Sequence, residues 1–338
     1  MKDNAMLHPF TSAILGWFVH HGRQLPWRET SDPYAIWLSE VILQQTRIQQ
    51  GRAYWERFMR RWPTVEALAA ASEDEVLREW QGLGYYSRAR HLHEAARQVV
   101  DAGGFPRTYE GLLALKGVGA YTAAAIGSFA FALPVAVVDG NVFRVLARHF
   151  GIATPINTTA GQKEFGALAQ SLLPVSAAAD YNQAMMDFGA TQCVPASPCC
   201  VACPLQESCV AWRERRVASL PVKLRKVKVT ERRLTYIYIR YDGETALRRR
   251  GAGDIWQGLW EPYLVEDRLP EGRLRLLAKD VRHILTHRIL LADFYLWCPD
   301  ERPQLPDGYQ WVREEDIVRY GVPRLVELLF EAVAVASV

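Results

Sequence analysis

The 338-residue chain is long enough for two domains, and its 49% hydrophobic residues can fill the cores of both. A formal net charge of +3 is too small to indicate nucleic-acid binding by itself. Six cysteines in this length, behind an N-terminus without a long apolar segment, disfavour a disulfide framework and a secretory signal. We therefore expect a cytoplasmic protein. The uncharged run 117–138 is expected to form a buried helix and an extended piece rather than a membrane span.

Residues 8–212 predict one helix after another, an all-α class. Apolar residues recur at helical spacing, and short turns with Gly or Pro separate the segments. The helices are expected at 33–50, 52–60, 73–79, 87–101, 121–131, 141–150, 161–172 and 180–190.

Glu40 is a candidate general acid in the first of these helices. Asp32 and Pro33 mark the start of the helix, so Glu40 lies two turns inside it, among apolar residues such as Trp37. A carboxyl group that loses water there has a raised pKa, which suits a proton donor. The alternative is a solvated position on the polar face of the helix near Gln44.

The segment GLGYYSRAR (82–90) combines a glycine-rich turn with aromatic and cationic residues, among them Tyr85 and Arg88. Such side chains suit base stacking and phosphate contact. Core packing is the alternative for one of its two tyrosines.

The segment LKGVGAYT (115–122) places Gly117 and Gly119 two residues apart between helical segments. A tight turn of this kind leaves backbone N–H groups free to bind one phosphate oxygen at a helix N-terminus. An ordinary turn between helices is the alternative.

Asp139 comes after a short apolar run and before a predicted helix. A plain N-cap is one interpretation. A carboxylate at a helix N-terminus is also expected to stay ionised, because the N–H donors favour the anion. Together with Glu40, the sequence predicts one raised and one lowered carboxyl pKa, a combination that separates an acid from an anionic stabiliser.

Four cysteines spaced C-x6-C-x2-C-x5-C predict a metal centre bound by Cys193, Cys200, Cys203 and Cys209. This spacing is not that of a zinc ribbon, and we favour a [4Fe–4S] cluster, with zinc left as an alternative. Cys199, beside Cys200, leaves the second ligand open by chemistry alone. Cys298 lies in an apolar run and is expected to be a buried thiol.

The pattern changes after residue 212. Residues 213–230, RERRVASLPVKLRKVKVT, are expected to form a basic linker. The alternating runs 234–241, 244–250 and 289–297 then predict strands, with short helices near 271–279 and 322–334. We therefore expect a helical domain at 1–212, which includes the cysteine loop 193–209, and a smaller α+β domain at 231–338.

The helical region resembles the helix–hairpin–helix DNA glycosylases with an iron–sulfur loop, and within them the MutY-type adenine DNA glycosylases. The matching segments follow the family's order: LPWR (25–28), WLSEVILQQT (37–46), GLGYYSRAR (82–90), LKGVGAYTAAAI (115–126), VDGNVFRVLAR (138–148), NQAMMDFGA (182–190) and the cysteine loop. The second domain resembles the family's Nudix-like domain through GLWEPY (258–263) and RHILTHRI (282–289). It lacks the glutamate cluster of Nudix hydrolases, which implies recognition rather than hydrolysis.

The resemblance implies a glycosylase that removes adenine mispaired with 8-oxoguanine or guanine in double-stranded DNA. Glu40 would protonate the adenine, Asp139 would stabilise the sugar cation, and Asn141 and Tyr121 would support this site. The remaining implied DNA contacts are Arg28 and Gln183 at the flipped adenine, Gln45 and Tyr85 in the duplex, Arg88, Gly117 and Gly119 at the backbone, and Thr286 and His287 at the lesion. In the family an aromatic residue and a serine often precede this histidine, whereas Leu285 and Thr286 precede His287 here, which is a departure from the pattern.

Tyr121 separates the two nearest functions. Endonuclease III-type glycosylase/lyases, which act on oxidised pyrimidines, carry a lysine at this position, and that lysine forms a Schiff base with the sugar. Without it, the chain is expected to be a monofunctional glycosylase, although Lys116 lies nearby in sequence. We expect a monomer that binds DNA and does not bind a membrane.

Overall fold

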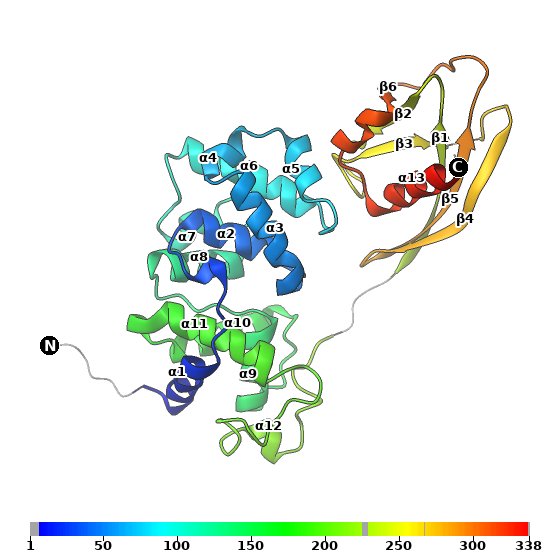
Figure 1. Ribbon diagram of the computed structural model, residues 1–338. Helices are drawn as coiled ribbons and strands as arrows, with labels where there is room; N and C mark the ends of the chain where they lie inside the picture. Colours follow the sequence, from blue (N-terminus) through cyan, green and yellow to red (C-terminus); the bar gives the residue numbers. More distant parts are fainter. Residues whose placement is uncertain (1–6, 225–228, 267, 337–338) are drawn as a thin grey trace. The chain divides into compact units, whose positions relative to one another are not determined.

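The computed structural model describes residues 7–224, 229–266 and 268–336 (Figure 1). The chain divides into two compact units, Met1–Trp55 with Gln98–Arg225, and Glu56–Arg97 with Lys226–Val338. Helices α3 (Ile48–Arg61) and α6 (Ser87–Asp101) each cross from one unit to the other. The domain boundaries expected from the sequence divide the chain differently and stay a prediction.

The first unit is helical, as predicted. Buried residues of α1, α9, α10 and α11, such as Ile14, Leu146 and Phe165, form its core. Its helices are α1 (Pro9–His21), η1 (Pro26–Arg28), α2 (Pro33–Ile42), α7 (Tyr109–Leu113), α8 (Ala120–Phe131), α9 (Gly140–Phe150), α10 (Thr159–Leu172), η2 (Val175–Ala177), α11 (Ala178–Asp187), η3 (Phe188–Gln192) and α12 (Val210–Arg213).

Local capping explains where several helices begin. The side chain of Asp32 accepts a hydrogen bond from the Tyr34 N–H at the start of α2, and Asp139 does the same for two N–H groups of α9. The expected single helix 33–50 is wrong, because α2 ends at Ile42 and α3 begins at Ile48. Between them Gln45 adopts a left-handed conformation with φ of 56°, which a continuous helix does not allow.

The second unit holds α4 (Val65–Ala70), α5 (Glu73–Glu79) and a six-stranded sheet. The described strands are β1 (Thr230–Ile239), β2 (Glu244–Arg249), β3 (Trp260–Leu264), β4 (Leu274–Ile284), β5 (Arg288–Trp297) and β6 (Tyr309–Arg313). Their order across the sheet is β4-β5-β1-β3-β2-β6, and β1 pairs with β5 in parallel while the other neighbours are antiparallel. The predicted strands at 234–241, 244–250 and 289–297 are confirmed.

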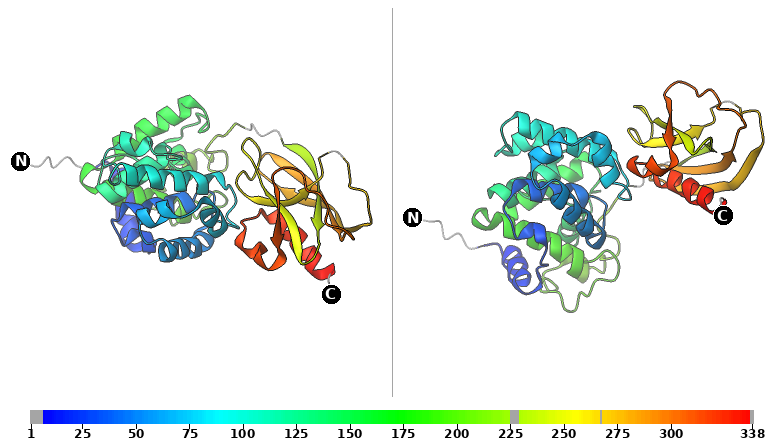
Figure 2. Two further views of the ribbon diagram at one scale, coloured as in Figure 1. Left: turned by 90° about the horizontal axis from the view of Figure 1, so that it is seen from above. Right: turned by 45° about the horizontal axis from the view of Figure 1, so that its top comes forward.

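Helix α13 (Arg324–Ala336), preceded by η4 (Glu314–Arg319), lies along one face of this sheet, as the views in Figure 2 show. It confirms the helix predicted near 322–334. The helix expected at 271–279 is wrong, since β4 begins at Leu274 and takes in the rest of this segment. Two register shifts, after Leu276 and after Ala278, interrupt the alternation of this strand and give it a helix-like pattern.

Within the described parts of the chain, no helix is long and apolar enough to span a bilayer.

Candidate functional site

A cavity of about 290 Å³ opens in the first unit among η1, α2, α8, α11 and the start of α9. Its volume is close to the lower end of the range usual for small-molecule sites, about 300–1,000 Å³. Six residues that the sequence singled out line it together: Arg28, Glu40, Tyr121, Asp139, Asn141 and Gln183.

Glu40 lies in the wall of this cavity and is 7% exposed. Burial raises the pKa of its carboxyl to about 7, while the Tyr121 hydroxyl and the Arg28 charge oppose that rise. The Tyr121 hydroxyl donates to Glu40 Oε2 over 2.5 Å. The alternative of a solvated Glu40 is therefore wrong, and the carboxyl can carry a proton near neutral pH.

Asp139 caps α9 with both carboxylate oxygens engaged. Oδ1 accepts the backbone N–H groups of Asn141 and Val142 at 2.8 Å each, and Oδ2 accepts Asn141 Nδ2 at 2.7 Å. Burial nevertheless raises the pKa of Asp139, since the loss of water outweighs these donors. The lowered pKa expected from the sequence is wrong. Asp139 still accepts three N–H donors, whereas Glu40 accepts one hydroxyl, so Asp139 has the stronger support for its anion.

Arg144 connects this carboxylate to the cysteine loop. Its Nη2 donates to Asn141 Oδ1 at 2.8 Å, and its Nε donates to the carbonyl oxygen of Cys193 at 2.8 Å. Another bond runs from Nη2 to the Gly189 carbonyl. Sequence reasoning missed Arg144, whose only signal was a cation one turn after Asn141 on a mostly apolar helix.

Arg28 was expected to contact the base, and the structure shows how its side chain is held. Its Nη1 and Nη2 donate to the two carboxylate oxygens of Asp187 at 2.8 Å each. Asp187 is completely buried at the end of α11 and also accepts hydrogen bonds from Arg23. Asp187 and Arg23 were not predicted from the sequence.

Gln45, Gly117 and Gly119 lie in turns of the first unit. Gln45 is exposed, and its neighbours Leu43 and Thr46 line the cavity. A non-glycine residue with positive φ beside a cavity is a strained position of the kind found at functional sites. Gly117 has φ of 72°, and Gly119 caps α8 without a side-chain hydrogen bond, so the first N–H groups of that helix lack a side-chain acceptor from the cap.

The four predicted ligand cysteines are free thiols after α11, and Cys193, Cys203 and Cys209 pack against the core of the first unit. Burial raises the thiol pKa of Cys200, Cys203 and Cys209, and the neighbouring cysteines raise it further. The four sulfur atoms therefore lie near enough to repel as thiolates, which a shared cation or cluster would relieve. In the described residues, no three side chains of His, Cys, Asp or Glu are arranged closely enough to hold a single metal ion.

Cys199 is exposed, whereas Cys200 is half-buried and interacts with Cys193 and Cys209. This difference favours Cys200 over Cys199 as the second ligand. Arg148, 3% exposed, donates to the carbonyl oxygens of Val194 and Pro195 and so holds the beginning of the loop. Cys298 is exposed at the end of β5, and its expected burial is wrong.

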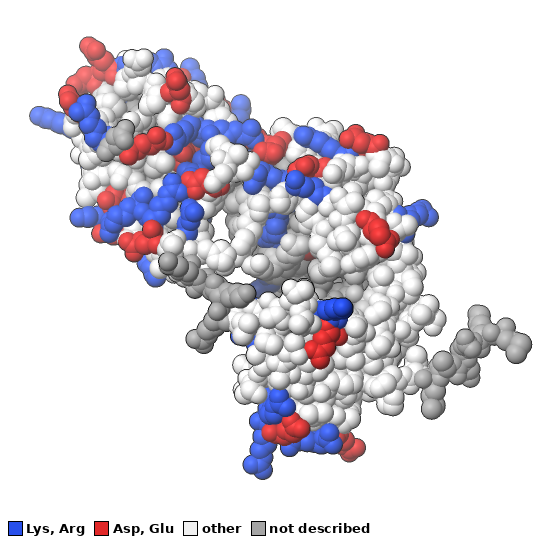
Figure 3. Space-filling model, turned by 180° about the vertical axis from the view of Figure 1, so that it is seen from behind, with Lys and Arg blue, Asp and Glu red and all other residues white. Residues whose placement is uncertain are grey.

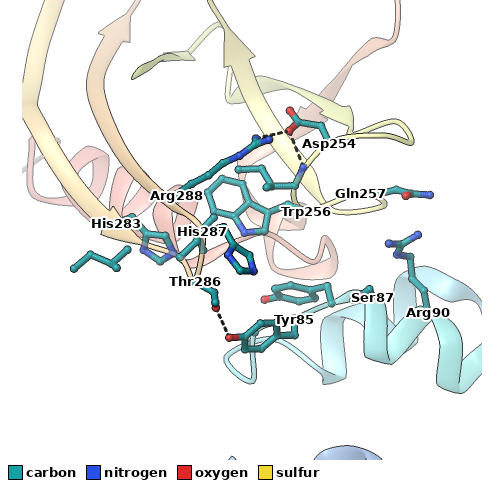
Figure 4. A pocket seen from close by; sticks show the side chains of 15 residues that line it. Tyr85, Ser87, Arg90, Asp254, Trp256, Gln257, His283, Thr286, His287 and Arg288 are labelled. Atoms are coloured by element: carbon teal, nitrogen blue, oxygen red, sulfur yellow. Dashed lines mark hydrogen bonds and ion pairs between the residues drawn. The ribbon is translucent and has the colours of Figure 1, made fainter. Parts of the chain in front are cut away.

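A second cavity, of about 620 Å³, lies within the second unit (Figure 4). It brings Tyr85 together with Thr286 and His287, and the Tyr85 hydroxyl lies 2.5 Å from Thr286 Oγ1 although the two residues are 201 apart in sequence. The loop residue Leu285 packs against the core beneath α13. Arg88 does not line this cavity, but its guanidinium lies over the Tyr85 ring at 5.6 Å and supports it.

Arg90, one of the cations of the segment 82–90, also lines this cavity, together with side chains that were not predicted, among them Asp254, Trp256, His283 and Arg288. Figure 4 shows them around Tyr85 and Thr286. Asp254 forms ion pairs with three arginines, Arg232, Arg250 and Arg288. Such pairing is frequent: on the face drawn in Figure 3, Lys and Arg are interspersed with Asp and Glu.

Two family models match the chain. The first, described as HhH-GPD superfamily base excision DNA repair protein, matches residues 38–169, and the second, a NUDIX domain, matches residues 235–332. The helical first part and the sheet-containing second part thus agree with the predicted fold classes.

Curated relatives named adenine DNA glycosylase are similar over much of the chain. The Homo sapiens protein is 45% identical over 222 residues, which cover 62% of this chain and 40% of the relative. The protein of Buchnera aphidicola subsp. Acyrthosiphon pisum (strain APS) is 32% identical over 254 residues, covering 74% of this chain and 73% of the relative. The matches thus span less than half the length of the mammalian relatives. Among solved structures, a thermostable thymine-DNA glycosylase matches with a TM-score of 0.57 and 33% identity, covering 61% of this chain and 95% of that chain.

Proposed function

The chain belongs to the adenine DNA glycosylase family, and from that membership we propose that it excises adenine mispaired with 8-oxoguanine or guanine. The observation that carries this proposal is a pair of carboxyls in one base-sized cavity, the buried Glu40 and the half-buried Asp139. Hydrolysis of an N-glycosidic bond needs a proton for the leaving base and an anion beside the sugar cation. The cavity supplies both groups.

Glu40 is the general acid of the proposed reaction. With a pKa of about 7, it is protonated in a large fraction of molecules at neutral pH. It gives that proton to a ring nitrogen of adenine while the bond from C1′ to the base breaks, and the bonding electrons leave with the base. Gln183 and Arg28 in the same wall orient the base.

Asp139 is the anion of the proposed reaction. The three N–H donors from Asn141 and Val142 fix its carboxylate and support its charge when the sugar becomes cationic. A water molecule then adds to C1′ and gives up one of its protons to the carboxylate of Asp139 or Glu40, which completes the hydrolysis. Tyr121 offers no amine for a Schiff base, so the activity is that of a monofunctional glycosylase.

The cysteine loop fits a [4Fe–4S] cluster in its donor chemistry, since the thiols of Cys200, Cys203 and Cys209 lie within electrostatic reach of one another and of Cys193. Cys193, Cys200, Cys203 and Cys209 would hold it. The cluster would supply a rigid cross-link of the loop rather than a reacting group. Through Arg144, the carbonyl of Cys193 also contributes to the position of Asn141.

The second cavity is proposed to receive the base opposite adenine. Tyr85 provides an exposed ring for stacking, while Thr286 and His287 offer hydrogen-bonding groups at the tip of the β4–β5 hairpin. Removing a base from the stack costs a few kcal/mol, about the energy that such contacts return. Gln45 and the N-terminus of α8 are proposed to contact the duplex and its backbone.

One assay tests the proposal. The protein is incubated with duplexes that carry A opposite 8-oxoguanine, A opposite G, or thymine glycol, and strand cleavage is measured before and after alkali. We expect alkali-dependent cleavage of the first two duplexes only. Cleavage of the thymine glycol duplex without alkali would instead support an endonuclease III-type lyase and overturn the proposal.

A further inference from the structure

Asp187 is a completely buried carboxylate next to the adenine cavity, and the mechanism above does not use it. Its two oxygens accept the Arg23 backbone N–H at 2.8 Å, Arg23 Nε at 2.7 Å, Arg23 Nη2, and both terminal nitrogens of Arg28 at 2.8 Å. Burial by itself would raise the pKa of Asp187, but these bonds hold the pKa below its ordinary value. Asp187 is therefore an anion between two cations.

The triad of Arg23, Arg28 and Asp187 lies beside the cavity that contains the proposed acid, Glu40. Arg23 and Arg28 both line the cavity that contains Glu40. The groups whose charge or hydrogen bond acts on Glu40 are Tyr121 from α8, Asp139 at the start of α9 and Arg28 from η1. Arg47 also lines the cavity. Arg28 is thus the cation whose charge acts most directly on the carboxyl.

We propose that Asp187 is a positioning residue for base excision: it fixes Arg28 in the cavity wall and limits the positive charge that reaches Glu40. This inference rests on the proposed function only in naming the reaction. Two arginines and one aspartate leave the triad with one net positive charge, and loss of Asp187 would leave two. Extra positive charge favours the ionised form of Glu40, which cannot donate a proton.

The charge argument predicts opposite effects for two variants. Asp187→Asn keeps the shape of the side chain and removes its charge, so the pH above which single-turnover excision declines should move down. Arg23→Gln removes one cation and keeps Asp187 paired with Arg28, so this pH should move up. The rate on the high-pH side should change about tenfold for each pH unit by which the decline moves, because the protonated fraction of a general acid falls tenfold over the same interval.

Asp187→Glu is the matched control, because it keeps the negative charge. Its excision rate should decline at about the same pH as that of the wild type. Equal losses of activity at every pH in Asp187→Asn and Arg23→Gln would overturn the proposal and leave Asp187 a structural residue. If Asp187→Asn does not fold, Arg23→Gln decides alone, and an unmoved profile contradicts the proposal.

A readout without catalysis separates this inference from the proposed function. Glutamate labelled with ¹³C at the side-chain carboxyl gives an NMR signal for Glu40, which Glu40→Gln identifies by its loss. The titration midpoint of that signal should fall in Asp187→Asn and rise in Arg23→Gln, even if the wild-type protein releases no adenine. An unmoved midpoint in both folded variants would overturn the inference, whereas absence of adenine release by the wild-type protein would overturn only the proposed function.

Discussion

The Tyr121 hydroxyl and the Glu40 carboxyl form a 2.5 Å hydrogen bond that joins α8 to α2 at the cavity wall. Burial raises the pKa of the phenol well above its ordinary value, so Tyr121 stays protonated and donates to Glu40. A donor to a carboxylate favours its ionised form and therefore moderates the effect of burial on Glu40. The bond both orients the carboxyl and adjusts its acidity.

Tyr121→Phe should therefore raise the pKa of Glu40 above its present value of about 7. The ratio of the excision rate at pH 8 to that at pH 6 should increase, because more Glu40 remains protonated at the higher pH. Single-turnover rates across this range provide the measurement. Tyr109→Phe on α7, outside the cavity lining, is the control. A lower ratio in Tyr121→Phe would contradict this role of the hydroxyl.

Glu40→Gln should stabilise the fold at high pH. The folded-state pKa of about 7 lies above the ordinary 4.5, so the contribution of Glu40 to stability is fully present below pH 4.5 and is lost as the pH rises through 7. The difference in the free energy of unfolding between wild type and Glu40→Gln should change by about 3 kcal/mol over this window. Urea unfolding at several pH values measures it, and a constant difference would contradict the raised pKa.

Cys200→Ser should lose most of the bound iron, and Cys199→Ser should keep it. The reason is that Cys200 interacts with Cys193 and Cys209, while Cys199 is exposed. Anaerobically purified wild-type protein should contain about four iron and four sulfide per chain, as expected for a [4Fe–4S] cluster. Stoichiometric zinc in place of iron would show that the cysteines serve another centre.

Thr286→Val keeps the β-branched shape and removes the hydroxyl that lies beside Tyr85. It should lower the preference for A opposite 8-oxoguanine over A opposite G by about tenfold or more, since a base-edge contact is worth about 1–3 kcal/mol. Thr235→Val, the same chemical change on β1, should leave the preference unaltered. Equal preference ratios in wild type and Thr286→Val would remove Thr286 from lesion recognition.

Local sequence signals predicted the helix starts and the burial of Glu40 because their causes are local. Asp32 caps the helix that follows it, and an apolar surrounding raises the pKa of any carboxyl. The break at Gln45 carries neither glycine nor proline, so its positive φ could not be predicted from the residue type. The bulges in β4 likewise hid this strand from sequence analysis, because they disturb its alternation and made the segment 271–279 look helical.

The electrostatic surroundings of the cavity could not be predicted in the same way. Asp139 was expected to have a lowered pKa from its cap position, but the balance depends on how much water the folded chain removes. The partners of Asp187 come from Arg23 and Arg28, 164 and 159 residues away. Only the folded chain brings these side chains together, so their ion pairs could not be predicted from the sequence.

The most direct test compares adenine release by wild type and Glu40→Gln under single-turnover conditions, with A opposite 8-oxoguanine as substrate. Free adenine is quantified by mass spectrometry, and binding of the duplex is measured in parallel. We expect Glu40→Gln to bind the duplex but to excise adenine more slowly by about 10²–10⁴-fold or more, the usual contribution of a general acid. Glu164→Gln, at an exposed position of α10, should behave like wild type. Near-wild-type adenine release by Glu40→Gln would contradict the proposed mechanism.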